Sequence, residues 1–139
     1  MKLYIDIVSA EGQIHSGAAR MVYAPAMMGE VGIAPRHAPL LTQLKPGQVR
    51  VEDLDGEQLS FFVGGGILEV QPHLVTVLSD TAERTADIDE AAAQEAQKRA
   101  EEALANADDK VDLEKAQAQL AEAAARLHAV KQLKGTTGN

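Results

Sequence analysis

The first part of the chain alternates between apolar and polar positions. Leu3, Ile5 and Ile7 are each separated by a single residue, and the same spacing recurs near residue 50. A period of two places alternate side chains on one face of a β-strand. The runs are short and are separated by the turn signals MMGE, KPGQ, DLDGEQ and VGGG, of which the third predicts a hairpin at its Asp-Gly pair. This pattern predicts an antiparallel β-sandwich, or flattened barrel, of about ten strands within residues 1–85.

The pattern changes near residue 86, where helical spacing replaces the period of two. Glycine and proline are absent from there until Gly135, and the residues that replace them favour helices. Asp87 followed by Glu90 predicts an N-cap with its capping-box partner, and NADDKVD predicts a second helix start near Asp112. The predicted apolar stripes are Ile88, Ala92, Ala96, Ala100, Ala103 and Ala107 on the first helix, and Leu113, Ala116, Leu120, Ala123, Leu127 and Val130 on the second. We therefore expect an antiparallel two-helix hairpin over residues 86–139.

Charge is divided unevenly along this predicted hairpin. Residues 86–114 hold ten acids and three bases, whereas residues 115–139 hold four bases and one acid, Glu122. One interpretation is matching to the helix dipole, which favours acids near a helix start and bases near its end. The other is that the last helix leaves its partner at times and faces an acidic surface, because a seam made mostly of alanine buries little apolar area. Both interpretations stay open at this point.

Composition excludes several classes of function. The 139 residues carry a formal net charge of −8, which suits nucleic acid poorly because its binders carry basic patches. The absence of cysteine excludes disulfides, thiol catalysis and thiolate metal sites. The N-terminus lacks the apolar run of a signal peptide, and no window approaches the roughly 18 apolar residues that span a bilayer. We expect a soluble, cytoplasmic protein with no direct membrane insertion.

No constellation of catalytic or metal-binding residues is visible. The four histidines, at positions 15, 37, 73 and 128, lack metal-ligand spacing, and no serine lies in a nucleophile-elbow motif. The glycine-rich GGGI at residues 64–67 lacks the Lys-Ser/Thr of a phosphate loop and predicts a tight crossing between strands instead. We therefore expect no catalytic residue, no cofactor and no metal.

The stretch PRHAPLLTQLKPG, residues 35–47, is rigid because three prolines fix its backbone. It holds His37 directly after Arg36. In one interpretation His37 only hydrogen-bonds to the neighbouring backbone. In the other, the loop presents His37 and Arg36 as part of a contact surface.

Four stretches together carry a resemblance to a known family. They are YIDIVSAEGQIHSG, GEVGIAPRHAPLLTQLKPG, GGGILEVQPHLVTVLSDTAER and DIDEA, in this order. In motifs, spacing and length the chain resembles the epsilon subunits of bacterial F-type ATP synthases over essentially its whole length. The resemblance implies a non-catalytic central-stalk subunit that couples the gamma subunit to the c-ring for proton-driven ATP synthesis. It also implies a peripheral place at the cytoplasmic face of the bacterial plasma membrane.

The resemblance implies roles for single residues as well. Glu30, in MMGEVG, corresponds to the family's acidic contact with the c-ring. The family's residues near the gamma and ring contacts correspond to Ser9, His37 and Thr42. The family's usual glycine before that histidine is Arg36 here, so we expect the backbone of the loop to differ.

For the hairpin, the resemblance implies a regulatory role. Folded, it permits turnover, and extended into the catalytic head of alpha and beta subunits it blocks ATP hydrolysis. The acidic surface that it meets there belongs to the beta subunit and suits a basic last helix. The residues that would face it are Arg126, Lys131 and Lys134.

Some members of the family bind ATP on the folded hairpin. The positions that match their ligand residues are Glu83, Ile88, Asp89, Ala93, Arg99 and Arg126. Two arginines of those members are Ala92 and Glu122 here, so a polyphosphate would lose two cationic contacts. The resemblance thus implies weak ATP binding at most.

Two other classes of function are alternatives. The first is a free-standing β-sandwich that binds a small ligand and uses the helices as a dimerisation arm, although its few aromatic residues offer little for a ligand to stack on. The second is a hydrolase, which no candidate nucleophile supports.

Overall fold

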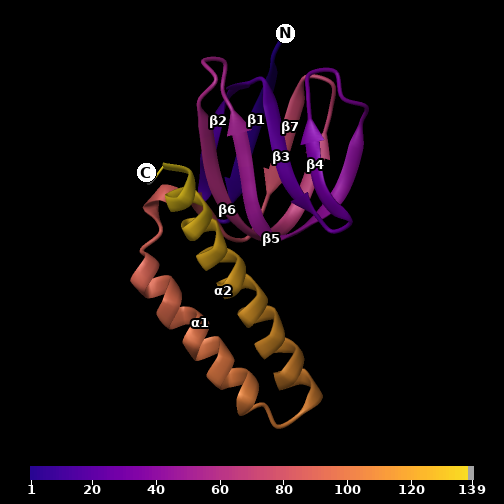
Figure 1. Ribbon diagram of the computed structural model, residues 1–139. Coiled ribbons are helices and arrows are strands. Elements are labelled where there is room, and N and C mark those ends of the chain that lie inside the picture. The colour runs from indigo at the N-terminus through magenta and orange to yellow at the C-terminus, as the bar shows by residue number, and fades with distance from the viewer. Residues whose placement is uncertain (138–139) are drawn as a thin grey trace. The chain divides into compact units, whose positions relative to one another are not determined.

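The computed structural model describes residues 1–137, and its residue contacts divide the chain into two units (Figure 1). As far as it is described, the first unit, Met1–Thr85, holds eight strands, and the second, Ala86–Asn139, holds two α-helices. The strands are β1 (Leu3–Ser9), β2 (Gly12–Ala19), β3 (Met21–Ala26), β4 (Gly29–Ile33), β5 (Leu40–Glu52), β6 (Gln58–Val70), β7 (Leu74–Leu78) and β8 (Ala82–Arg84). The helices are the 3-10 helix η1 (Thr85–Asp87), α1 (Glu90–Ala105) and α2 (Lys110–Thr137). This confirms the predicted fold class, a β-sandwich followed by two packed helices.

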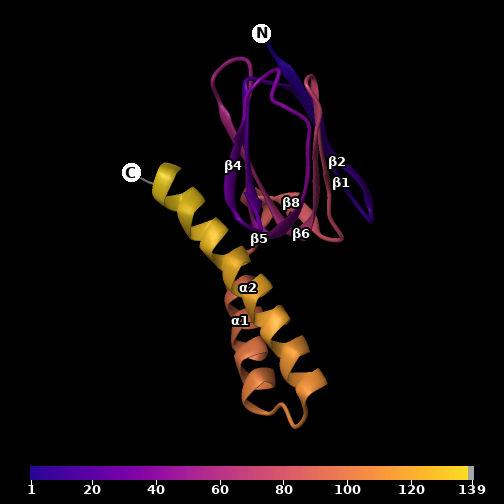
Figure 2. The same ribbon diagram turned by 90° about the vertical axis from the view of Figure 1, so that its right-hand side faces the viewer.

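The strands form one hydrogen-bonded sheet that folds into two layers. Its order is β2-β1-β7-β6-β5-β3-β4, with β8 paired to β6. β1 and β7 run parallel, and the other pairs are antiparallel. Figure 2 shows the layers edge-on, with β4 in one and β1 and β2 in the other. The side chains between them form the core.

The core includes the alternating apolar residues of the first strand. Leu3, Ile5 and Ile7 are at most 1% exposed, and every strand from β1 to β7 contributes to the same buried cluster. With two phenylalanines and no tryptophan in the chain, most of this core is aliphatic. Residues on the other side of each strand face away from this cluster, and the exposed ones among them form the candidate binding surfaces.

The number of strands is eight in the described residues, fewer than the ten or so expected. KPGQ and VGGG, interpreted as turns, instead lie inside β5 and β6, each of 13 residues. Gly65 and Gly66 have φ values of 99° and 131°, so β6 bends there without ending. Before the bend β6 pairs with β8, and after it with β7. The tight crossing expected at GGGI is confirmed, because a Cβ on Gly66 would overlap the backbone carbonyl oxygen of Leu78.

The hairpin expected at the Asp-Gly pair joins β5 to β6. Gly56 adopts a φ of 86°, which a glycine reaches without strain. The Asp53 carboxylate accepts hydrogen bonds from the backbone N–H groups of Asp55 and Glu57, both at 2.9 Å. This Asx-type turn closes the connection between the two long strands.

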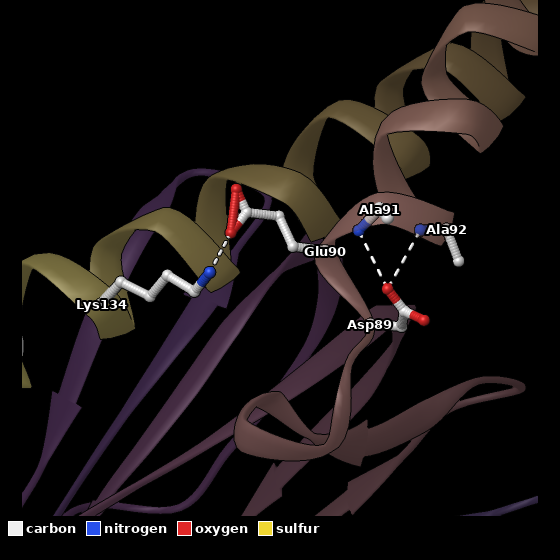
Figure 3. A network of polar contacts seen from close by, with 5 residues as sticks. All are labelled: Asp89, Glu90, Ala91, Ala92 and Lys134. Carbon is white, nitrogen blue, oxygen red and sulfur yellow. Dashed lines mark hydrogen bonds and ion pairs between the residues drawn. The ribbon is translucent and has the colours of Figure 1, made fainter.

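The first helix begins later than its capping box predicted. Asp87 belongs to η1, and the N-cap is Asp89, whose carboxylate accepts from the N–H groups of Ala91 (2.9 Å) and Ala92 (3.3 Å) (Figure 3). The prediction of Asp87 was wrong because one 3-10 turn precedes the α-helix. Asp109 caps α2 in the same way, accepting from the N–H of Asp112 at 2.7 Å.

The inward face of α1 also differs from the predicted stripe. Ala93 and Ala100 are buried, whereas Ala92 is exposed. Ala93 lies seven residues before Ala100, close to two full turns, so both face the same side. On α2, three residues of the predicted stripe are buried, namely Ala116, Leu127 and Val130, whereas Leu113 is 40% exposed.

Candidate binding surfaces

The turn between β3 and β4 presents both apolar and acidic groups. Met27 is 57% exposed and Met28 98% exposed, and Glu30 follows them on β4. We call Met27, Met28 and Glu30 the β3–β4 tip. Of these residues only Glu30 was predicted as a contact from the sequence. The two methionines stood beside it in MMGE, but nothing in a turn motif distinguishes exposed from buried methionine.

The carboxylate of Glu30 has a partner within the sandwich. Arg50 Nη2, on β5, donates to Glu30 Oε1 at 2.9 Å. The guanidinium of Arg50 also lies over the ring of Tyr23, on β3, 4.5 Å from its centre. The side chain of Glu30 remains 54% exposed and that of Arg50 is 33% exposed. The acidic group is therefore held in place while still reaching solvent.

The loop that connects β4 to β5 is fixed through its backbone. Arg36 adopts a φ of 68°, the left-handed conformation that a glycine favours, and its N–H donates to the carbonyl oxygen of Pro72 at 2.9 Å. The arginine thus keeps a glycine-like backbone geometry, at a strain cost of about 1–2 kcal/mol. His37 Nδ1 donates to the carbonyl oxygen of Ala38 at 2.7 Å, which agrees with the first interpretation of this histidine. A contact role for His37 stays a prediction.

A second exposed apolar surface lies on the outer side of the sheet. Leu41 is 70% exposed, Ile67 46% and Leu78 49%. Ile67 is paired with Leu78, and Leu78 with Val8, so these side chains stand in one row across three strands. Leu41, on β5, lies diagonal to Ile67, because Leu41 is paired with Glu69 and Ile67 with Gln43. We call Val8, Leu41, Ile67 and Leu78 the outer apolar face. Strand alternation could have identified it, because its members are the outward neighbours of core residues.

The structure separates the predicted contact residues Ser9 and Thr42. Ser9 ends β1 beside the outer apolar face, where it lines a cavity of about 330 Å³ together with Val8 and Gly64–Gly66. Its hydroxyl accepts from the N–H of Glu11 at 3.1 Å. Thr42 is half-buried and points to the opposite side of β5 from Leu41. On that strand, therefore, the exposed apolar residue is Leu41.

A cavity of about 450 Å³ is lined by residues of both helices. The lining residues are Ala93, Ala96, Arg99, Ala100, Ala103, Gln119, Glu122, Ala123 and Arg126. Three of the predicted ATP-binding positions therefore come together here. Asp89 is the N-cap of α1, Ile88 is buried, and Glu83 lies on β8 in the sandwich. Glu122 places a negative charge among the two arginines of the lining.

The basic residues of α2 differ in their surroundings. Lys131 is exposed and Arg126 is half-buried. Lys134 forms an ion pair with Glu90, at the opposite end of the hairpin sequence (Figure 3). This pair joins the last turns of α2 to the first turn of α1. The side chain of Lys134 is 67% exposed, so the pair contributes at most about 1 kcal/mol.

One titratable group of the sandwich is perturbed. Burial lowers the pKa of His15, and the nearby Arg84 lowers it further, while Asp6 opposes both effects. The ring of His15 lies 4.9 Å from that of Phe61, centre to centre. His15 therefore packs against the buried Phe61, and it does not line the cavity beside Ser9.

Among residues 1–137 no helix is long and apolar enough to cross a membrane. Over the same residues no three His, Asp or Glu side chains gather as metal ligands would.

Two family models match the chain in succession. The model described as "ATP synthase, Delta/Epsilon chain, beta-sandwich domain" matches residues 2–85, and the one described as "ATP synthase, Delta/Epsilon chain, long alpha-helix domain" matches residues 86–131. A protein of Alkalilimnicola ehrlichii named ATP synthase epsilon chain is 61% identical over 132 residues, which are 95% of this chain and 94% of the relative. One of the same name from Nitrosococcus oceani is 57% identical over 138 residues, 99% of each chain.

Solved structures share the fold at low sequence identity. A chain in a structure of the Euglena gracilis mitochondrial ATP synthase (OSCP, F1 and c-ring) matches with a TM-score of 0.75 at 17% identity, covering 98% of this chain and 81% of that one. A chain in a structure of the central stalk and c-ring of the Tetrahymena thermophila mitochondrial ATP synthase matches with a TM-score of 0.65 at 12% identity, covering 94% and 97%. At these identities the likeness concerns the fold alone.

Proposed function

The chain belongs to the family of ATP synthase epsilon chains, non-catalytic subunits of the F-type ATP synthase, and from this we propose a separate role for each of its two units. The sandwich, residues 1–85, docks between the gamma subunit and the c-ring in the central stalk. The hairpin, residues 86–139, restrains ATP hydrolysis. The complex holds the chain at the cytoplasmic face of the plasma membrane as a peripheral subunit.

The observation that carries the docking role is exposed apolar surface on a sandwich whose core is already complete. Large apolar side chains that remain outside a closed core mark a partner surface when they are grouped. Here they gather on the outer apolar face, beside Ser9, and at the β3–β4 tip. We assign the former to the gamma subunit and the latter, with its carboxylate, to the c-ring. His37 and Thr42, in and after the fixed loop, complete the proposed contact.

The regulatory role draws support from the charge and packing of α2. Four bases against one acid in residues 115–139 suit an acidic surface, such as the one proposed on the beta subunit. The seam against α1 is mostly alanine, so little apolar contact opposes separation of the helices. Arg126, Lys131 and Lys134 are the proposed contacts of the extended helix with the catalytic head.

Affinity isolation tests the function as a whole. An affinity-tagged chain, expressed in its own bacterium, should bring down a multi-subunit ATPase from detergent-solubilised membranes, with ATPase activity in the eluate. The matched control is the tagged chain with Met28→Asp and Leu41→Asp, one change on each proposed surface, which should elute without the complex. Isolation of the wild-type chain alone, as a dimer, would favour the ligand-binding module with a helical dimerisation arm.

We propose further that the cavity between the helices binds ATP weakly at most. Each missing arginine removes a charge-assisted phosphate contact of about 1.5–3 kcal/mol, so two weaken binding by roughly two to four powers of ten. If binding is weakened to a dissociation constant of about 2 mM or more, 1 mM ATP should raise the melting temperature of the isolated chain by less than about 1 °C. Differential scanning calorimetry measures this.

Glu122 offers a matched pair of variants for that measurement. Glu122→Arg restores one cation to the lining and should increase the ATP-induced shift, whereas Glu122→Gln only removes the acid and should increase it less. A shift of several degrees in the wild type would show that Arg99 and Arg126 suffice for nucleotide binding.

A further inference from the structure

Three neighbouring strands arrange a stack of side chains that ends at Glu30. The sheet order places β3 between β5 and β4. Arg50 is paired with Tyr23 across β5 and β3, and its side chain continues over the Tyr23 ring to reach Glu30 on β4. The guanidinium therefore crosses the middle strand, with an aromatic ring beneath it and a carboxylate at its end.

The ring in this stack is itself fixed. Tyr23 is paired with Gly32 on β4, and a Cβ at Gly32 would lie 3.4 Å from Cε1 of Tyr23. The ring thus lies close to Gly32, and the guanidinium of Arg50 lies over it. A planar guanidinium stacks on such a ring and donates at a defined direction, which a lysine ammonium does not do.

The consequence concerns the freedom of Glu30. A glutamate on a strand edge has many rotamers, and ordering such a side chain on binding costs about 0.5–1.5 kcal/mol. The hydrogen bond to Arg50 occupies Oε1 and restricts those rotamers, yet the side chain stays 54% exposed. The carboxylate is therefore held ready next to the exposed Met27 and Met28.

We propose that Arg50, supported by Tyr23, is a positioning residue that presents the Glu30 carboxylate to a cationic group flanked by apolar residues on the docking partner. This inference rests on the proposed docking role of the β3–β4 tip. The partner group is a lysine or arginine side chain, because the tip combines an anion with two unbranched apolar side chains. Arg50 acts through Glu30 and does not need to touch the partner.

Charge and positioning predict opposite effects, which makes the inference testable. Removing the Arg50 cation makes the surroundings of Glu30 more negative, so a purely electrostatic role predicts tighter binding of a cationic partner. Positioning predicts weaker binding, by about 2- to 10-fold for the ordering cost above. Arg50→Lys separates the two further, because it keeps the charge and loses the stacked fork.

The experiment measures rebinding of the fluorescently labelled full-length chain to ATP synthase complexes stripped of this subunit, together with ATP-driven proton pumping. Arg50→Gln, Arg50→Lys and Tyr23→Leu should each weaken binding by about 2- to 10-fold, whereas Tyr23→Phe should bind like wild type. Arg20→Gln, at an exposed arginine elsewhere, is the matched control and should have no effect. The melting temperatures of the free variants should stay near that of the wild type.

The decisive comparison repeats Arg50→Gln in a Glu30→Gln background. If Arg50 acts through Glu30, it should then have no further effect on binding. An equal loss in both backgrounds, or tighter binding of Arg50→Gln, overturns the positioning role. If Glu30→Lys binds as tightly as wild type, the docking role of the tip fails, and with it this inference. If Glu30→Lys weakens binding and Arg50→Gln does not, only the positioning role fails.

Discussion

Deletion of residues 86–139 is expected to leave a folded sandwich that supports ATP synthesis but no longer restrains ATP hydrolysis. The buried cluster of the sandwich comes entirely from β1–β7, so its core stays closed without the helices. The proposed contacts with gamma and the c-ring also lie within residues 1–85. ATPase assays on complexes that carry the full-length or the truncated chain measure the change. Unchanged hydrolysis after truncation would show that the hairpin is not an inhibitor in this protein.

The charge of α2 can be tested separately from its presence. Changing Arg126, Lys131 and Lys134 together to glutamine should weaken inhibition, and added salt should weaken inhibition by the wild type, because exposed charges are screened beyond about 10 Å at 0.1 M. A triple variant that inhibits like wild type would mean that the helix acts by steric insertion. The asymmetry of charge would then reflect dipole matching alone.

Lys134 complicates that series, because its ion pair with Glu90 joins α2 to α1 and adds up to about 1 kcal/mol to the closed hairpin. Glu90→Gln is the control that resolves this. It removes the pair but keeps the lysine cation, so it should leave inhibition equal to that of wild type or stronger. The triple variant loses both the pair and the cations, and comparing the two separates closure from attraction.

Gly66→Ala is expected to destabilise the sandwich by roughly 4 kcal/mol or more, which is a large share of the stability of an ordinary domain. The new Cβ would overlap the Leu78 carbonyl oxygen and lie 2.9 Å from Cα of Ser79, and both belong to backbone that pairs with β6 or follows it. The φ of 131° adds strain for any side chain. For a unit of this size the melting temperature should fall by more than about 15 °C. Circular dichroism during thermal and urea unfolding measures both quantities.

Two other glycines serve as controls for that substitution. Gly56 has a φ of 86° with open space around it, so Gly56→Ala should cost only about 1 kcal/mol of backbone strain. Gly17→Ala meets the His15 ring at an ordinary 3.7 Å and should change stability little. If Gly66→Ala unfolds no more readily than Gly56→Ala, the close approach of β6 to β7 does not constrain the fold.

Local sequence patterns predicted the core strand, the hairpin and the helices, because these elements depend mainly on neighbouring residues. The alternation of Leu3, Ile5 and Ile7 was sufficient to place them in the core, because one face of each strand is buried. The Asp-Gly pair predicted its hairpin because few residues other than glycine reach the positive φ that a tight turn requires. The helical composition after residue 86 likewise needed no tertiary information.

Where prediction was wrong, a contact distant in sequence decided the outcome. KPGQ and VGGG have turn composition, but pairing along the whole length of β5 and β6 holds them in strands. The N-cap of α1 is an exception, because Asp87 and Asp89 are both good N-caps and a local 3-10 turn selected the second. The partnership of Glu30 with Arg50 spans 20 residues across three strands, and no spacing in the sequence signals it.

The alanine seam of the hairpin has a consequence for heat capacity. Unfolding or opening raises heat capacity in proportion to the apolar surface that it exposes, and alanines such as Ala93, Ala100 and Ala116 expose little. The free energy of opening the helices should therefore change almost linearly with temperature, whereas the stability of the sandwich follows a pronounced dome. The equilibrium between the closed and the open hairpin would therefore shift steadily with temperature across the growth range of the bacterium. No temperature within that range would give maximal closure.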